Sequence, residues 1–286
     1  MRNIARDYPK VKEIEALIKD YSETAHLDAL EFVASSVRGR FKITQADIDE
    51  FVERIKKHEP VTRIVGSRGF WRSEFKVTPD VLDPRPDTEC LVGAVLEHFK
   101  ELWPERRILD IGTGSGCVLI SLLWEYPNSK GVAIDISPEA LKIAKLNAYR
   151  IQRQEWERTK NIELIEFIER NFYDEDFTKD LGRFDIIVSN PPYIPTAEID
   201  SLHPSVRLYD PLIALDGGKD GLDAYRALAK HLKHLLTDDG LIFLEIGKGQ
   251  AKAVTRLMYD AGYKIRAKYR DYGKIVRVLV FSPYKK

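Results

Sequence analysis

Short apolar stretches of strand character alternate with longer stretches of helical character from Asp87 to the C-terminus. The expected strands are residues 107–111, 131–136, 162–168, 184–189, 240–246, 263–269 and 275–281, and the expected helices are residues 87–99, 115–126, 137–150, 220–236 and 249–260. This alternation predicts a largely parallel sheet with helices on both faces. The last two strands are separated only by residues 270–274, which are too few for a crossover helix, so these strands should pair antiparallel. An α/β fold with a seven-stranded mixed sheet and an antiparallel last strand is therefore expected.

The chain before Asp87 has a different pattern. Residues 1–60 carry apolar side chains at helical spacing only, such as Val11, Ile14 and Ile18, which predicts a small helical bundle. Residues 61–86 contain two glycines, an alternating apolar segment and three prolines, which favour a hairpin and a linker. We therefore expect an N-terminal helical domain over residues 1–60, a hairpin and linker over 61–86, and an α/β domain over 87–286.

The charge balance limits the classes of partner. Lys plus Arg and Asp plus Glu both number 45, so the formal net charge is zero, which disfavours nucleic acid as the main partner. Two cysteines, Cys90 and Cys117, are too few for a disulfide framework and fit a reducing compartment. The sequence shows no Cys or His cluster with metal-ligand spacing, no apolar signal core and no apolar run long enough to span a bilayer. A cytoplasmic protein without a metal or a membrane anchor is expected.

A glycine-rich loop follows the first strand of the α/β region. The dinucleotide-binding pattern fails here, because the third glycine comes one residue early and Cys117 takes its place. Asp110 precedes the loop and Asp135 ends the second strand, where an acidic side chain can accept hydrogen bonds from ribose hydroxyls. These features suit S-adenosylmethionine, with Asp110 near its amino group, Asp135 on its ribose, and the loop against it through Gly112, Thr113, Gly114, Ser115 and Gly116. A purely structural glycine turn with a helix-capping aspartate is the alternative.

The tetrapeptide Asn190-Pro191-Pro192-Tyr193 directly follows a strand rich in β-branched residues. Two prolines cannot continue a sheet, because neither has an N–H to donate. The exit leaves the Asn190 side-chain oxygen and the Pro191 carbonyl as acceptors at a strand's carboxyl end, where α/β sheets bind ligands. Two acceptors suit the two hydrogens of an amide or an exocyclic amine, and Tyr193 offers a ring face to a planar target. The tetrapeptide therefore indicates methylation of an NH2 group, with a strand-ending turn as the alternative.

The tetrapeptide alone does not separate glutamine from adenine or cytosine as the target. Further segments do, and together with Asn190–Tyr193 they resemble the HemK/PrmC family of protein-(glutamine-N5) methyltransferases: residues 59–66, Phe70-Trp71, residues 84–89, Asp210-Pro211, residues 214–218 and residues 220–222. The resemblance implies a class I, Rossmann-like, S-adenosylmethionine-dependent methyltransferase fold with a helical N-terminal domain that helps to grip the substrate protein. It implies as substrate the glutamine in the Gly-Gly-Gln motif of bacterial-type peptide-chain release factors, and hence a role in translation termination. A monomer without stable nucleic-acid binding is expected.

The same resemblance implies roles for individual residues. Phe172 should stack on the cofactor's adenine, although Asn171-Phe172 stands where the family usually has Asp-Trp. Asn190 should contact both cofactor and substrate, and Arg85 should lie at the substrate or at the methionine end of the cofactor. Asp87 or Thr88 could instead cap the following helix. The segment 245–248 differs from a His-containing variant common in the family, and no role is assigned to it.

Two other functions remain open on the sequence. A nucleic-acid adenine-N6 methyltransferase would use the same acceptor pair, with a flipped base stacked on Tyr193. A basic recognition domain would be expected in that case, and the neutral charge argues against one. A non-catalytic nucleotide-binding module would keep the glycine loop but would have no need for Asn190–Tyr193.

Overall fold

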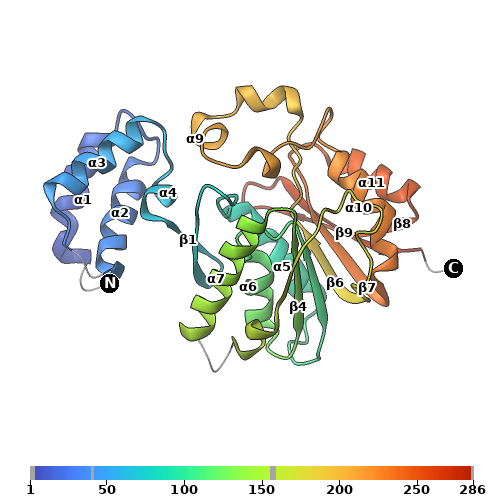
Figure 1. Ribbon diagram of the computed structural model, residues 1–286. Coiled ribbons are helices and arrows are strands. Elements are labelled where there is room, and N and C mark those ends of the chain that lie inside the picture. Colours follow the sequence, from blue (N-terminus) through green and yellow to red (C-terminus); the bar gives the residue numbers. More distant parts are fainter. Residues whose placement is uncertain (1–3, 40–41, 155–158, 285–286) are drawn as a thin grey trace. The chain divides into compact units, whose positions relative to one another are not determined.

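The computed structural model describes residues 4–39, 42–154 and 159–284. The chain divides into two compact units (Figure 1). The first unit comprises Met1–Ser67 together with Leu202–Asp210, and the second comprises Arg68–Ser201 together with Pro211–Lys286. A short segment from the middle of the chain therefore belongs to the N-terminal unit.

The first unit is helical. Its helices are α1 (Ile4–Ile18), α2 (Ala25–Gly39), α3 (Gln45–Lys56), α4 (Val61–Val65) and α9 (Pro204–Arg207). Thr44 caps α3 in a capping box with Asp47, which satisfies backbone N–H groups at the helix start. The apolar stripes meet in one core in which the rings of Phe32 and Phe51 stack with centroids 4.2 Å apart. The helical N-terminal bundle predicted from the apolar spacing is confirmed.

Helix α4 lies where the sequence suggested only a hairpin and a linker. Pro60 precedes it in an extended conformation, and Gly66 ends it with a φ of 73°. Val61, Ile64 and Val65 pack against the core of the first unit. Burial of this apolar face stabilises a helix too short to be recognised from periodicity. The hairpin itself is present as β1 (Ser67–Phe70) and β2 (Ser73–Lys76).

The second unit contains the predicted seven-stranded sheet. Its strands are β3 (Arg107–Ile111), β4 (Lys130–Asp135), β5 (Glu166–Glu169), β6 (Phe184–Ser189), β7 (Leu236–Glu245), β8 (Tyr263–Arg270) and β9 (Val276–Pro283). The order across the sheet is β5-β4-β3-β6-β7-β9-β8, and β9 runs antiparallel to both of its neighbours. The other neighbouring pairs are parallel. The chain turns back between β3 and β6, which is the place where open α/β sheets bind ligands.

Helices cover both faces of this sheet (Figure 1). One core joins the sheet to α5 (Glu89–His98), α6 (Cys117–Glu125) and α7 (Pro138–Gln154), and the other joins it to α10 (Asp223–His231) and α11 (Ala251–Asp260). Ile108 and Leu109 are neighbours on β3 and enter opposite cores, as the alternation of side chains along a strand requires. The sheet is thus buried on both sides, and ligand access is left to its ends.

Two element assignments from the sequence are wrong. Residues 162–168 do not form one strand: a 3-10 helix, Lys160–Leu164, precedes the short β5. The buried Asn161 side chain donates to the carbonyl groups of Leu123 (3.0 Å) and Tyr126 (2.9 Å), which favours a turn at this point. The helix expected at 220–236 ends at His231, and Leu236 already belongs to β7, where it pairs with Phe184 of β6.

Candidate active site

A cavity of about 570 Å³ lies in the second unit at the carboxyl ends of β3, β4 and β6. Its volume is within the range typical of small-molecule and cofactor sites. The lining comes from the loop after β3, the end of β4, the segment after β5 and the exit from β6, with additional residues from 80–88 and 211–216. The topology therefore gathers the two sequence motifs in one cavity.

The glycine loop is shaped for close approach of a ligand. Gly112, Gly114 and Gly116 have φ values of 74°, 53° and 81°, a region that side chains disfavour. Gly112 and Gly114 line the cavity together with Thr113 and Ser115, whereas Gly116 does not. A Cβ atom on Gly116 would lie 2.9 Å from Ile120 Cδ1, so this glycine permits the start of α6 to pack. The loop thus combines a ligand-facing part and a structural glycine.

Four aspartates line this cavity, Asp80, Asp110, Asp135 and Asp216, and burial perturbs the carboxyl groups of Asp110 and Asp135. Asp110 is buried and accepts a hydrogen bond from Thr113 Oγ1 at 2.7 Å. Asp135 accepts from the backbone N–H groups of Gly114 (2.8 Å) and Ser137 (3.0 Å). Burial raises the pKa of both, that of Asp110 to about 7 with a further contribution from the charge of Asp135. A positively charged ligand would favour the ionised carboxylates, so the cavity suits a cation that carries hydroxyl donors.

Asn190 directly follows β6 and lines the same cavity. Its side-chain Nδ2 donates to Thr88 Oγ1 at 3.2 Å, and Thr88 also lines the cavity. Pro192 lines it as well, whereas Pro191 and Tyr193 do not. The Tyr193 ring lies close to Gly247, where an added Cβ would be 3.0 Å from Tyr193 Cδ2. Burial raises the pKa of the Tyr193 hydroxyl to about 12. Of the predicted tetrapeptide, the structure therefore brings Asn190 and Pro192 to the cavity.

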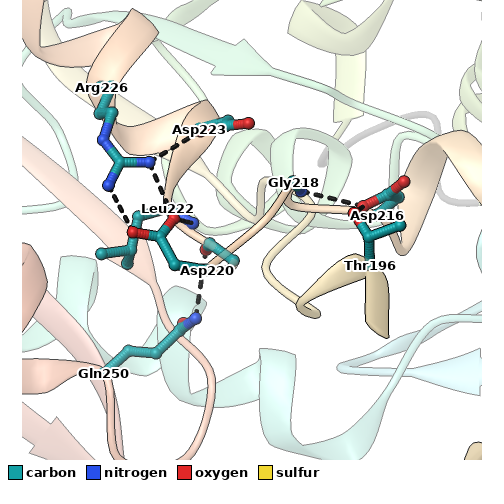
Figure 2. A network of polar contacts seen from close by, with 9 residues as sticks. Thr196, Asp216, Gly218, Asp220, Leu222, Asp223, Arg226 and Gln250 are labelled. Carbon is teal, nitrogen blue, oxygen red and sulfur yellow. Dashed lines mark hydrogen bonds and ion pairs between the residues drawn. The ribbon is translucent and has the colours of Figure 1, made fainter. Parts of the chain in front are cut away.

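A polar network holds the segment that follows the tetrapeptide (Figure 2). Gln250 Nε2 donates to the carbonyl groups of Tyr193 (2.8 Å) and Gly221 (3.1 Å). In the same network, Asp216 Oδ1 accepts from Thr196 Oγ1 at 2.7 Å and from the Gly218 N–H at 2.9 Å. The exit from β6 is thereby fixed to two later loops, and none of these polar partners could be assigned from the sequence.

The glycines of these loops allow them to touch the tetrapeptide. A Cβ on Gly217 would lie 2.8 Å from the Tyr193 Cα, and one on Gly221 would lie 2.4 Å from the Tyr193 carbonyl oxygen. Arg226 closes the second loop from α10 through hydrogen bonds to Asp220 and Asp223, as Figure 2 shows. The segments 214–218 and 220–222, which carried part of the family resemblance, therefore position the tetrapeptide.

Other predicted residues also take definite places. Arg85 lines the cavity, and so does Phe172, which packs beside the Tyr173 ring with centroids 4.6 Å apart. Thr88 precedes α5, but its side chain makes no capping hydrogen bond. Asp87 pairs with Arg277 at 2.9 Å.

The sequence did not identify every part of the cavity. Residues 80–82 and 211–214 also line it, and Leu212 and Ile213 are exposed there. In residues 4–39, 42–154 and 159–284, no three His, Cys, Asp or Glu side chains are grouped to hold a metal ion. The helices in the same ranges are all too short or too polar to cross a membrane.

Comparison with known proteins relates these features to a family. The family model of the Methyltransferase small domain matches residues 89–202. The release factor glutamine methyltransferase of Caulobacter vibrioides is 43% identical over 219 residues, which cover 76% of this chain and 71% of that protein. The one from Agrobacterium fabrum is 40% identical over 239 residues, with 82% and 78% covered. A solved structure of a methyltransferase from Pyrococcus furiosus is 19% identical in sequence, and the match covers 72% of this chain and 87% of the other chain. The TM-score of 0.50 supports a similar fold and nothing more.

Proposed function

Because the chain belongs to the family of release factor glutamine methyltransferases, we propose that it methylates the side-chain amide N5 of the glutamine in the Gly-Gly-Gln motif of peptide-chain release factors. One observation supports this most strongly: Asn190 and the two aspartates of the glycine loop region line a single cavity. Such a cavity can bring a methyl donor and a planar NH2 group together.

The residues present fit S-adenosylmethionine as the methyl donor. Asp110 and Asp135 would hold its amino group and its ribose, Gly112 to Ser115 would lie against it, and Phe172 would contact the adenine. When bound, this cofactor supplies a methyl group on a cationic sulfur, an electrophile that requires no metal. The buried carboxylates favour binding of that cation.

Asn190 would act on the substrate amide. An amide nitrogen is a weak nucleophile because its lone pair is delocalised into the carbonyl. If the Asn190 oxygen accepts one amide hydrogen and the Pro191 carbonyl the other, the lone pair is directed at the methyl group and positive charge on nitrogen is stabilised. Positioning and preorganised electrostatics of this kind contribute about 3 kcal/mol for each well-placed group. The nitrogen gains the N–C bond as the C–S bond breaks, and it then loses one proton to solvent.

The helical first unit would serve substrate recognition. It carries exposed apolar side chains, among them Leu17, Tyr21 and Leu27. Its core is built from aliphatic and aromatic residues. We therefore assign the first unit to holding the release factor, and the second unit to the reaction. A monomeric enzyme in the cytoplasm, where release factors act, completes the proposal.

The class of substrate can be tested with cofactor labelled in its methyl group. The enzyme is incubated separately with a bacterial-type release factor and with double-stranded DNA. Label is expected on the release factor and not on the DNA. Transfer to DNA alone would favour the adenine-N6 alternative, and transfer to neither would leave only cofactor binding. A variant of the release factor with its Gly-Gly-Gln glutamine changed to alanine is the matched control and should take up no label.

A further inference from the structure

Glu245 is a buried carboxyl group beside Asn190. It is the last residue of β7 and is 1% exposed. The parallel pairing of β6 with β7 sets Ser189 opposite Leu244, so the next residues along the chain, Asn190 and Glu245, are neighbours, and Asn190 lines the cavity. Within the described part of the chain, its Oε2 atom has no hydrogen-bond partner. A carboxyl group this buried needs a specific reason, because burial of a charge is costly.

Hydrogen-bonding side chains from two other elements face Glu245. Burial raises the pKa of Glu245 to about 7, and hydrogen bonding by the Thr88 hydroxyl and by the Asn190 amide opposes this effect. Asn190 Nδ2 also donates to Thr88 Oγ1 at 3.2 Å. The NH2 end of the Asn190 side chain is therefore directed toward Thr88 and Glu245.

An asparagine side chain presents a donor at one end and an acceptor at the other, and the two ends have nearly the same shape. An ionised carboxylate only accepts hydrogen bonds, so next to Glu245 the NH2 end of Asn190 is favoured and the oxygen end must point elsewhere. We propose that Glu245 is a positioning residue that fixes the Asn190 amide with its oxygen available to the substrate NH2 group. This inference rests on the proposed function, since it assigns Glu245 a part in orienting the acceptor.

Protonation of Glu245 should weaken this control, because a neutral carboxyl can also donate to the Asn190 oxygen. The charged groups that face it are Arg277, which favours the ionised form, and Asp87, which opposes it. Burial raises the pKa values of Cys90 and Tyr193 to about 11 and 12, and that of Tyr225 far higher, so these neighbours are neutral at pH 7. The rate of methyl transfer should therefore fall as the pH is lowered through about 7.

The first test replaces Glu245 by glutamine, which keeps the shape and adds a donor. With saturating cofactor, Glu245→Gln should lower the single-turnover rate on a release factor at pH 8 by roughly ten- to a hundred-fold, the loss typical when a residue that orients a metal-binding side chain is replaced. Its pH profile should also lose the decline below pH 7. Cofactor affinity, measured by calorimetry at each pH, should change less than about two-fold, which separates this effect from titration of Asp110.

Glu125→Gln is the matched control. Glu125 is also a buried carboxylate of the second unit, but it accepts from Trp71 Nε1 (2.8 Å) and Arg72 Nε (2.7 Å) and does not line the cavity. This variant should keep the wild-type rate and pH profile. A similar rate loss in both glutamine variants would overturn the proposal, because it would show a general effect of removing a buried charge.

The second test exchanges the amide and the carboxyl group between positions 190 and 245. Asn190→Asp alone places two carboxyl groups together, whereas Asn190→Asp with Glu245→Gln restores one donor facing one acceptor. The double variant should react at least about ten-fold faster than Asn190→Asp. Equal rates for these two proteins would contradict a positioning role.

A readout without turnover distinguishes failure of this inference from failure of the proposed function. The side-chain NH2 signals of Asn190, assigned in nitrogen-15 NMR spectra by their loss in Asn190→Asp, should shift with a midpoint near pH 7 in the wild type. The shift should be absent in Glu245→Gln and present in Glu125→Gln. If the Asn190 signals do not respond to pH in the wild type, the role of Glu245 is wrong, even if the enzyme methylates release factors. If the signals respond as expected but no release factor is methylated, the proposed function is wrong instead.

Discussion

Replacement of Asn190 by alanine is expected to lower the single-turnover rate of release factor methylation by about two to three orders of magnitude. The Asn190 oxygen would accept a substrate hydrogen most strongly when positive charge develops on nitrogen, so its loss affects the transition state more than the bound state. The measurement is a rapid-quench time course with saturating cofactor and release factor. Since Asn190 is one of many groups at the cavity, cofactor affinity should change much less than the rate.

Asp135→Ala provides the contrasting control. Asp135 faces the cavity from the end of β4, and its carboxylate should hold the cofactor by charge-assisted hydrogen bonds of about 1.5–3 kcal/mol each. This variant should weaken cofactor binding and retain most of the rate at saturation. Wild-type rates in Asn190→Ala would mean that the residue only ends a strand.

The surroundings of Asn190 affect what is expected of the Asn190→Asp variant. On the sequence alone, this variant should retain more activity than Asn190→Ala, because aspartate keeps an acceptor of the same shape. In the fold, however, the Asn190 NH2 group faces Thr88 and Glu245. Aspartate loses that donor and brings a second carboxyl group to a buried one, which raises the pKa of the pair. We therefore expect no advantage over alanine unless Glu245 is changed as well.

Replacement of Arg63 by methionine should destabilise the first unit by about 3–5 kcal/mol. Arg63 Nη2 lies 2.6 Å from Asp210 Oδ1, and the two side chains are 3% and 1% exposed. This ion pair joins α4 to the segment Leu202–Asp210 within the first unit. Methionine leaves the Asp210 carboxylate buried without the positive charge of Arg63. The measurement is native-state hydrogen exchange of amide groups in α3, which reports the first unit separately from the second.

The double variant Arg63→Met with Asp210→Leu tests the reason for that loss. Replacement of both partners by apolar side chains of similar volume removes the uncompensated charge and is often neutral. It should therefore recover most of the stability lost in Arg63→Met. An unchanged exchange rate in Arg63→Met would show that the buried pair contributes nothing measurable.

The sequence predicted the central part of the sheet best. The bounds of β3 and β6 agree with the expected strands because both are buried on two faces and are rich in apolar residues. At the edge of the sheet the signal is weaker: β5 is partly exposed, and its preceding 3-10 turn depends on buried hydrogen bonds from Asn161. Helix α4 is stabilised by contacts with the core of the first unit, which no local pattern reveals.

The same distinction holds for the site. Asp110, Asp135 and Asn190 could be predicted because each belongs to a local motif at the carboxyl end of a strand. Glu245 and Gln250 could not, because their positions beside the tetrapeptide depend on the pairing of β6 with β7 and on loops far apart in the sequence. A motif identifies groups that act on a ligand, whereas the groups that orient them are determined by tertiary structure.

The most direct test of the proposed reaction is to locate the transferred methyl group. A release factor is incubated with the enzyme and cofactor, digested, and sequenced by tandem mass spectrometry, with the Asn190→Ala enzyme in a parallel reaction for the same time. We predict a single methyl group on the side-chain nitrogen of the Gly-Gly-Gln glutamine, with little or none in the parallel reaction. A methyl group on any other residue, or equal modification by both enzymes, would contradict the assignment of this cavity to glutamine methylation.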